Sequence, residues 1–381
     1  MAAQAWRTDG DAAEPNARVT SEERSRPKLR GPSSARANSG KTSSPTPGRN
    51  WRLPFWVFLV GAFTSLAVYF VTISHERAER RRDFDRRAAQ VARAAQASFD
   101  VPLEVLRSIP ALFDASTEVT RTEFRAFVQS SLSRYPWIYA LEWIPRVPGD
   151  QRARFEAAAI RDGLTRYHFK QDAPNGPPVP ADERPEYFPL FYMEPPNPVA
   201  LGIEETALGA RKVALERARD LNTTVITEQL KLVQDAVTVK SVIAFHPVYR
   251  PGSKPSSPVA RRQALIGYAA AVFRVEPVVR AALRDIDLDL LDVVLIDTEP
   301  ESQNVLFQSR PGAASTELDK TRAVWEDVAT IGARRWAFRV IDRANWVHAP
   351  RSGWMTLLMG LLTSLLADGQ NFRPALLNDD K

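Results

Sequence analysis

The chain has 381 residues, with 51 Lys or Arg against 45 Asp or Glu and a formal net charge of +6. It contains no cysteine, which excludes disulfides, a thiolate nucleophile and cysteine-ligated metal sites. The basic residues are scattered among acids rather than gathered into a stripe with interleaved aromatics, so the charge does not indicate a nucleic-acid partner. The length is sufficient for two small domains or one elongated domain.

The amino-terminal end combines a polar tail with an apolar run. Residues 1–50 are rich in Ser, Pro, Ala and Arg and poor in large apolar side chains, so we expect a disordered tail. Residues 53–73 carry no charge, and a helix of that length would span about 31 Å, close to the roughly 30 Å hydrocarbon core of a bilayer. We therefore predict a transmembrane helix over residues 51–73.

A second apolar run lies near the carboxyl terminus. It covers residues 352–367, about 24 Å as a helix, and predicts a second, short membrane helix followed by a polar tail over residues 368–381. Arginines are more frequent after the first run than before it, which taken alone favours a cytoplasmic main body. The positive-inside rule weakens for long domains, and these arginines alternate with acids. The distribution of charge therefore leaves the orientation open.

Residues 74–111 predict a stalk helix that leaves the membrane, with a break at Pro102. The first part of this helix carries an apolar stripe at helical spacing, made of Phe84, Ala88, Val91, Ala95 and Phe99. Two interpretations of the stripe are open, namely packing against the chain's own domain and the seam of a parallel homodimer.

Residues 112–346 mix helices with mostly antiparallel strands, in two successive modules over residues 112–273 and 274–346. This pattern predicts an α+β fold with two PAS-like antiparallel sheets. The predicted helices cover residues 122–134, 150–162, 207–221 and 276–284. The predicted strands cover residues 137–146, 187–193, 241–249, 264–273, 288–296, 305–309 and 335–341, and residues 251–258 predict a polar hairpin connection.

The motifs do not indicate enzyme chemistry. The four histidines are far apart, and no H-E-x-x-H, P-loop, Rossmann glycine pattern or G-x-S-x-G elbow occurs, so we predict no catalytic residue, no metal and no cofactor. We interpret His246, in an alternating strand, as structural or ligand-facing. The acids from Asp285 to Asp292 fit a solvated strand face better than a calcium loop, while Glu204 and Glu205 complement the start of the next helix.

Residues 186–195 concentrate aromatic side chains between carboxylates. An apolar pocket with one orienting polar group needs such residues, but ordinary core strands use them as well, and both interpretations are open.

Several short motifs, taken in order, carry a family likeness between about residues 112 and 273. They are Trp143-Ile144-Pro145-Arg146-Val147, Arg154-Phe155-Glu156, Glu186-Tyr187-Phe188-Pro189, Gly202, and Phe245-His246-Pro247-Val248-Tyr249 with Gly267. The ordered set resembles a CHASE domain. CHASE domains are extracytoplasmic sensory modules of bacterial histidine kinases and of nucleotide and diguanylate cyclases, held between two membrane helices, and plant relatives bind a cytokinin.

The resemblance implies a long helix, two PAS-like sheets and a small ligand on the membrane-distal sheet. Glu194 is the candidate polar anchor, because a carboxylate accepts charge-assisted hydrogen bonds from N–H donors. The residues implied to bind the ligand are Tyr187, Phe188, Tyr192, Glu194, Thr227, Leu230, Ala244, Phe245, Tyr249, Gly267 and Ala269.

We therefore expect a sensor anchored in the cell inner membrane, with a periplasmic ligand-binding domain that relays its signal through the membrane helices. CHASE proteins usually continue into a transmitter domain, and we expect this chain to lack one and not to be an enzyme. Its expected partners are a small molecule, the membrane and a second copy bound through the stalk helix, without nucleic acid. A membrane-anchored periplasmic hydrolase and a ligand-free scaffold are the alternatives.

Overall fold

The computed structural model describes residues 52–173, 176–207, 209–230, 241–299, 304–314, 322–343 and 351–370. The tail predicted over residues 1–50 lies outside the described residues, as do residues 371–381 of the second predicted tail. The helices are α1 (Arg52–Ala97), α2 (Asp100–Ala115), α3 (Arg121–Arg134), α4 (Arg152–Arg161), α5 (Gly209–Leu221), α6 (Pro258–Ala264), α7 (Val275–Ala282) and α8 (Arg351–Gln370), with a 3-10 turn over Gly149–Gln151.

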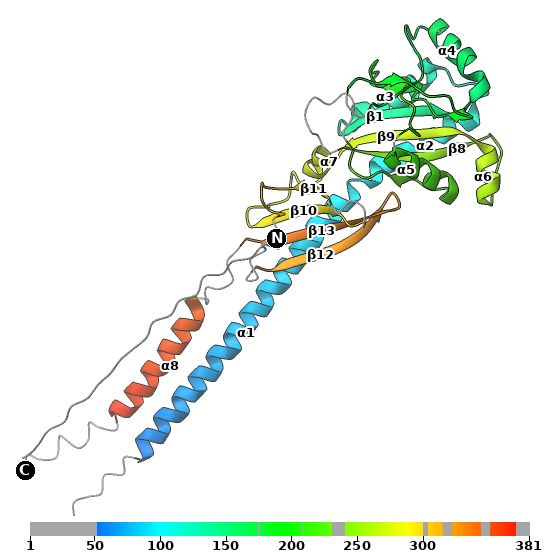
Figure 1. The fold of residues 1–381 in the computed structure, drawn as a ribbon. Helices are drawn as coiled ribbons and strands as arrows, with labels where there is room; N and C mark the ends of the chain where they lie inside the picture. The colour runs from blue at the N-terminus through cyan, green and yellow to red at the C-terminus, as the bar shows by residue number, and fades with distance from the viewer. Residues whose placement is uncertain are drawn as a thin grey trace, which may run out of the picture. The chain divides into compact units, whose positions relative to one another are not determined.

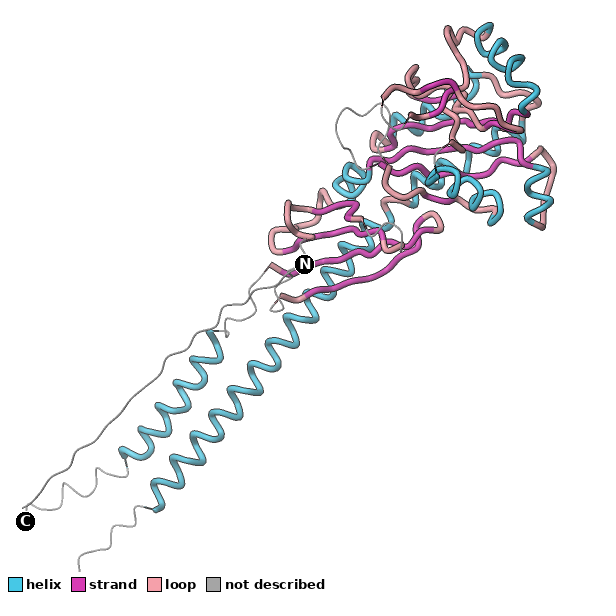
Figure 2. Tube along the Cα trace, in the orientation of Figure 1, coloured by secondary structure: helices cyan, strands magenta, loops and turns pink. Residues whose placement is uncertain are grey.

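The predicted mixture of helices and antiparallel strands is confirmed, and the longer strands form two sheets (Figure 2). The five-stranded sheet has the order β6-β1-β9-β8-β7, and the four-stranded sheet has the order β11-β10-β13-β12. The strands are β1 (Ile138–Pro145), β2 (Val147–Pro148), β3 (Lys170–Gln171), β4 (Val179–Pro180), β5 (Glu186–Tyr187), β6 (Tyr192–Glu194), β7 (Val225–Ile226), β8 (Ser241–Tyr249), β9 (Leu265–Arg274), β10 (Leu291–Asp297), β11 (Val305–Gln308), β12 (Val324–Ile331) and β13 (Arg334–Asp342).

The predicted membrane segment forms the first part of α1, a helix of 46 residues. Among the described residues, one helical stretch, Phe55–Ala115, is long and apolar enough to cross a membrane, by length and composition. Its apolar side chains are exposed, as with Phe63 and Phe70. The second predicted membrane helix coincides with α8, which extends past residue 367 to Gln370, and its passage through a membrane stays a prediction.

The long helix is interrupted at Ser98 and Phe99 and not at Pro102, where the sequence predicted the break. Pro102 lies in the first turn of α2, where a helix does not use the backbone N–H that proline lacks. The helix therefore tolerates proline at position 102. It resumes at Asp100, directly after the interruption at Ser98 and Phe99.

The apolar stripe of α1 packs against the chain's own four-stranded sheet. All five of its side chains are buried in one core with Trp336 and Phe338 of β13. The ring of Phe99 meets the Trp336 ring edge-on, with centroids 5.1 Å apart, and Arg81 donates a hydrogen bond to the carbonyl oxygen of Val324 (3.2 Å). Of the two interpretations of the stripe, packing within the chain is the one observed.

Helices cover both faces of the five-stranded sheet (Figure 1). We call the face against α2 the inner face, with Val242 and Ala244 of β8 in the same core as α2. We call the opposite face the outer face, with Ile243 and Phe245 in a second core that includes α5. The strict alternation along β8 places neighbouring residues on opposite faces, as the two-residue period of a strand requires.

The two sheets touch at a hairpin. The backbone N–H of Ile226, in the edge strand β7, donates to the carbonyl oxygen of Gly332 in the turn between β12 and β13 (2.8 Å). A Cβ at Gly332 would lie 2.4 Å from Cγ1 of the Ile226 side chain, so the two residues are in close contact. An edge strand of one sheet is thereby tied to a turn of the other.

Two sequence predictions of secondary structure were wrong, and one helix was missed. The strand predicted over residues 187–193 is two short strands in different sheets, because Pro189 cannot donate to a ladder and Leu190 donates instead to Ile203 (2.8 Å). The polar connection predicted over residues 251–258 does join β8 to β9, but helix α6, capped by the Ser257 hydroxyl, follows it and was not predicted. The strand predicted from residue 288 begins at Leu291, after a turn in which Asp287 and Asp289 are exposed.

Candidate ligand-binding face

The sheet divides the predicted ligand-binding residues between its two faces. Tyr192, Ala244 and Ala269 are buried in the core of the inner face, and Glu194 pairs in register with Leu141 of that same core. By contrast, the outer-face core holds Tyr187, Phe188, Phe245 and Leu230. One ligand on one face of the sheet cannot contact both groups.

The inner-face residues have protein partners. The Tyr192 hydroxyl donates to the Val119 carbonyl oxygen (3.0 Å), and its ring stacks on Phe191 with centroids 4.4 Å apart. Glu194, the predicted polar anchor, is buried and pairs with Arg125 of α3 through a 2.7 Å contact from Nε to Oε1. The guanidinium of Arg125 therefore occupies one of the two carboxylate oxygens of Glu194.

The outer-face aromatics pack under the segment that follows β5. Tyr187 is 2% exposed. Its hydroxyl donates a hydrogen bond to the Asp182 carbonyl oxygen and accepts one from the Arg184 backbone N–H, each at 2.9 Å. The Phe188 ring lies 5.4 Å from that of Tyr268 in β9. These side chains form a closed apolar floor against the outer face.

The remaining predicted residues have structural contacts within the sheet or with the helix beside it. The Thr227 hydroxyl accepts from the Ile243 N–H (3.1 Å), and the Tyr249 hydroxyl donates to the Arg219 carbonyl oxygen (2.9 Å). Gly267 lies where a Cβ would be 2.4 Å from the Ile144 carbonyl oxygen. Glycine at this position is explained by close packing of β9 against β1.

The sequence analysis missed a buried ionic cluster on the outer face. Glu142 of β1 lies between Leu141 and Trp143 of the inner core, so alternation directs it to the outer face. Glu142, Glu205 and Arg211 of α5 are each exposed by 4% or less. Arg211 Nη1 contacts both Glu205 carboxylate oxygens, at 3.2 and 3.1 Å, and its Nη2 lies 3.9 Å from Asp172.

The cluster is incompletely paired. Within the described part of the chain, no hydrogen bond or ion pair reaches the Glu142 carboxyl. Among the same residues, Nε of Arg211 and Oδ1 of Asp172 are also buried without a hydrogen-bond partner. Because buried polar groups are normally hydrogen-bonded, these atoms mark a place where a further donor or acceptor fits.

Burial sets the protonation of the two glutamates. It raises the pKa of Glu142 to about 8, with a further contribution from the neighbouring Glu205 charge and an opposing one from Arg211. Burial likewise raises the pKa of Glu205 to about 7, although Arg211 counteracts it. At neutral pH Glu142 is mostly protonated and can donate a hydrogen bond, which an ionised carboxylate cannot do.

The local backbone brings Glu205 to this position. Gly202 adopts φ +83°, and a Cβ there would lie 2.3 Å from the His168 carbonyl oxygen. The chain then runs back along residues 188–190, where the Glu205 N–H donates to the Phe188 carbonyl oxygen (3.0 Å). The neighbouring Glu204 turns away and accepts from the Phe188 N–H (3.0 Å), so Glu204 and Glu205 fix this segment rather than serve only the start of α5.

His246 lies on the inner face, half-buried, with Nδ1 2.9 Å from the Thr224 hydroxyl oxygen. Burial lowers the pKa of His246 to about 4, helped by the charge of Arg107. His246 was interpreted as either structural or ligand-facing. A neutral imidazole hydrogen-bonded to Thr224 agrees with the structural role.

We expect Glu142→Gln to flatten the dependence of stability on pH. The pKa of Glu142 is higher in the folded than in the unfolded chain, so the unfolded chain loses its proton first and wild-type stability falls as pH rises from about 4.5 to about 8. The variant should lie within about 1 kcal/mol of wild type at pH 5 and exceed it by about 4–5 kcal/mol at pH 9. Urea unfolding of the full-length chain followed by circular dichroism measures this difference.

Glu216→Gln is the matched control, because Glu216 is an exposed acid on α5 and its substitution should leave the pH profile unchanged. Parallel pH profiles for Glu142→Gln and wild type would contradict the raised pKa.

A long helix carries two antiparallel sheets in a mixed helix-and-sheet domain, with a buried and incompletely paired polar cluster in the five-stranded sheet. A family model for the CHASE domain matches residues 117–307, half of the chain, and the chain therefore belongs to the CHASE domain family. Among curated proteins, none matches the sequence.

Three solved structures show weak likeness to the chain. The ligand-binding domain of the Pseudomonas aeruginosa amino acid chemoreceptor PctC, in complex with GABA, is 11% identical with a TM-score of 0.40, over 67% of this chain and 95% of that one. An extracellular ligand-binding receptor from Desulfohalobium retbaense is 7% identical with a TM-score of 0.41, over 67% of this chain and 39% of that one. A methyl-accepting chemotaxis protein X is 13% identical with a TM-score of 0.33, over 72% and 97%. Scores at this level carry no argument about the ligand.

Proposed function

We propose that the chain is a membrane-anchored extracytoplasmic sensor that binds a small polar molecule on the outer face of its five-stranded sheet. Membership of the CHASE family supports a sensory role. The observation that carries the site is the cluster of Glu142, Glu205 and Arg211, which is buried yet incompletely paired. A ligand that completes these hydrogen bonds stabilises the bound state by removing the penalty of unsatisfied buried groups.

The chemistry of the cluster selects the kind of ligand. Glu205 and Asp172 supply acceptors, Arg211 supplies an unpartnered N–H, and the protonated Glu142 both donates and accepts. A compact molecule with adjacent N–H donors and acceptor atoms, such as a nucleobase or an amino acid, matches this set, and the surrounding aromatic floor accommodates a flat or apolar part.

Thermal-shift measurements on the full-length chain in detergent test the proposal. Adenines, amino acids and organic acids at about 1 mM are the probes, and one class should raise the melting temperature because it binds only the folded form. The shift should disappear in Glu142→Leu and persist in the exposed control Glu216→Gln. A flat response across all three classes, or a shift that Glu142→Leu leaves intact, would contradict the assignment.

A periplasmic hydrolase is the second candidate, since two neighbouring carboxyls with raised pKa values are suited to acid–base chemistry. In the described part of the chain, however, no hydrogen bond or ion pair reaches the Glu142 carboxyl, whereas a catalytic acid or base is normally held by a hydrogen-bonded partner. Product formation from a bound probe, abolished by Glu142→Gln, would favour the hydrolase over the sensor.

For membrane attachment we propose that the apolar part of α1 crosses the inner membrane and that α8 crosses it a second time. The β-sheets then lie in the periplasm, and signalling passes through these helices to the other side of the membrane. A compartment-dependent reporter inserted between residues 251 and 256 should report the extracytoplasmic side. Homodimerisation through α1 would use a face other than the stripe, which is already buried within the chain.

A further inference from the structure

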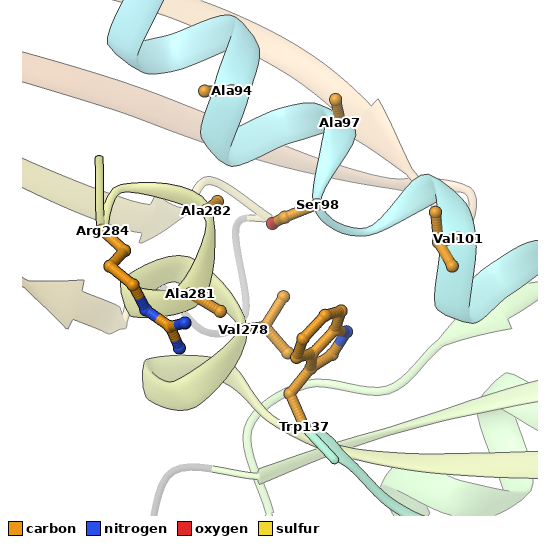
Figure 3. A pocket seen from close by; sticks show the side chains of 9 residues that line it. All are labelled: Ala94, Ala97, Ser98, Val101, Trp137, Val278, Ala281, Ala282 and Arg284. Carbon is orange, nitrogen blue, oxygen red and sulfur yellow. The ribbon is translucent and has the colours of Figure 1, made fainter. Parts of the chain in front are cut away.

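A groove lies at the interruption between α1 and α2, away from the outer face of the five-stranded sheet. Its volume is about 400 Å³, within the range of small-molecule sites. In Figure 3, Ala94, Ala97 and Ser98 of the α1 end and Val101 of α2 form one wall, and the side chains of α7 form the other. The indole of Trp137 lies at the foot of the groove, between the two walls.

The lining of this groove is apolar except at one end. The α7 wall consists of Val278, Ala281 and Ala282, and Val101 opposite is 39% exposed. Arg284 follows α7 and is the one charged residue among the described residues that line the groove. No ion pair or hydrogen bond to its guanidinium is formed within the described part of the chain, whereas Arg280, one turn earlier, pairs with Glu276.

Two further polar groups line the groove, the Ser98 hydroxyl and the Trp137 indole N–H, and the indole N–H has no hydrogen-bond partner among the described residues. The Ser98 hydroxyl already donates to the Ala95 carbonyl oxygen (2.6 Å), so its proton is used within the helix. The groove thus combines an apolar and aromatic body site with one cationic end, and that charge selects a carboxylate over an amine or a neutral molecule.

We propose that this groove binds a small arylalkyl carboxylate, with its carboxylate on the Arg284 guanidinium and its ring against Trp137, Val101 and Val278. A molecule held there contacts α1, α2 and α7 at once, so it stabilises the arrangement of the helices around the interruption at Ser98 and Phe99. The site shares no residue with the outer-face cluster, and its test does not depend on the proposed sensor ligand.

The test is calorimetric titration of the full-length chain in detergent with 3-phenylpropionate, which we expect to bind with a Kd in the low millimolar range for a probe of this size. Arg284→Gln should weaken binding by about tenfold or more, and Arg280→Gln, which removes the same charge one turn earlier at a residue that does not line the groove, should leave it within about twofold. Ala97→Phe should also block binding, because it fills the groove from an exposed position of α1.

Phenethylamine, which has the same ring and chain length with the opposite charge, is the ligand control and should bind at least tenfold more weakly. The proposal is overturned by the absence of 3-phenylpropionate binding to wild type, by equal binding of the amine, or by binding that survives both Arg284→Gln and Ala97→Phe. Hydrogen exchange at residues 97–101 gives a second readout, since bound 3-phenylpropionate should slow exchange there in wild type but not in Arg284→Gln.

Discussion

Replacing Arg211 by Met should destabilise the protein by about 3–5 kcal/mol at pH 8, because the change leaves buried carboxylates without their counter-charge. Arg211 is 4% exposed and contacts both oxygens of Glu205. Methionine matches the length of the arginine stem, so the loss of the guanidinium dominates over the loss of packing. Urea unfolding of the full-length chain, with the midpoint and slope compared to wild type, measures the effect.

The pH dependence separates this explanation from a general packing defect. Without Arg211, burial and the charges of Asp172 and Glu204 act unopposed and raise the pKa of Glu205 further, so the variant loses stability as pH rises and its defect should shrink at pH 5. Adding Glu205→Gln to Arg211→Met should recover about 2 kcal/mol at pH 8, since the unpaired charge is then gone. The control is Lys212→Met, because Lys212 is exposed on the same helix. A defect of equal size at both pH values would argue for packing instead.

Replacing Gly267 by Val should cost about 3 kcal/mol or more and impair folding at 37 °C. A Cβ there would lie 2.4 Å from the Ile144 carbonyl oxygen, 2.7 Å from the Trp143 ring and 2.9 Å from Cα of Pro145. Two of these neighbours are backbone atoms of the central strand β1, which cannot move without breaking the ladder between β1 and β9. Thermal unfolding of the full-length chain measures the loss.

Gly209→Ala is the matched control for Gly267→Val. A Cβ at Gly209 meets nothing within 4 Å, and alanine favours the helix that begins there, so this variant should be neutral or slightly stabilising. Tolerance of valine at position 267 would show that β9 can separate from β1 and would reopen a ligand-facing role for this glycine.

The sequence predicted the elements whose hydrophobic period was strong. The stripe from Phe84 to Phe99 and the strand that became β8 both carry regular apolar spacing, and both occur in the structure. Strand β12 was missed because it lies at a sheet edge and carries Glu326 and Asp327 in its middle, which blurs the alternation of a half-buried strand. Helix α6 was missed because it has seven residues, too few for a helical period to emerge.

The candidate site was harder to predict than the fold because its key residues are charged. Family likeness and aromatic content directed the search to the segment around Tyr187 and Glu194, yet Glu194 faces α3 and its partner Arg125. The missed signals were an acid, Glu142, inside a strand whose neighbours are buried on both faces, and an arginine, Arg211, on the buried face of α5 with Ala214 and Leu215. A charge at an apolar position is seldom fully buried without a partner, and this rule could have linked the two.

The hydrogen bond from Ile226 to Gly332 joins the two sheets directly, in addition to the connection through helices α1 and α2. Strand β7 continues directly into Thr227, which is bonded to β8 beside Phe245 of the outer face. A shift of that strand would pull on the tip of the β12–β13 hairpin, and β13 in turn holds Trp336 against Phe99 at the helix interruption. Movement at the proposed ligand site would thus reach α1 and α2 from the side, through β13, as well as along the axis of the helices.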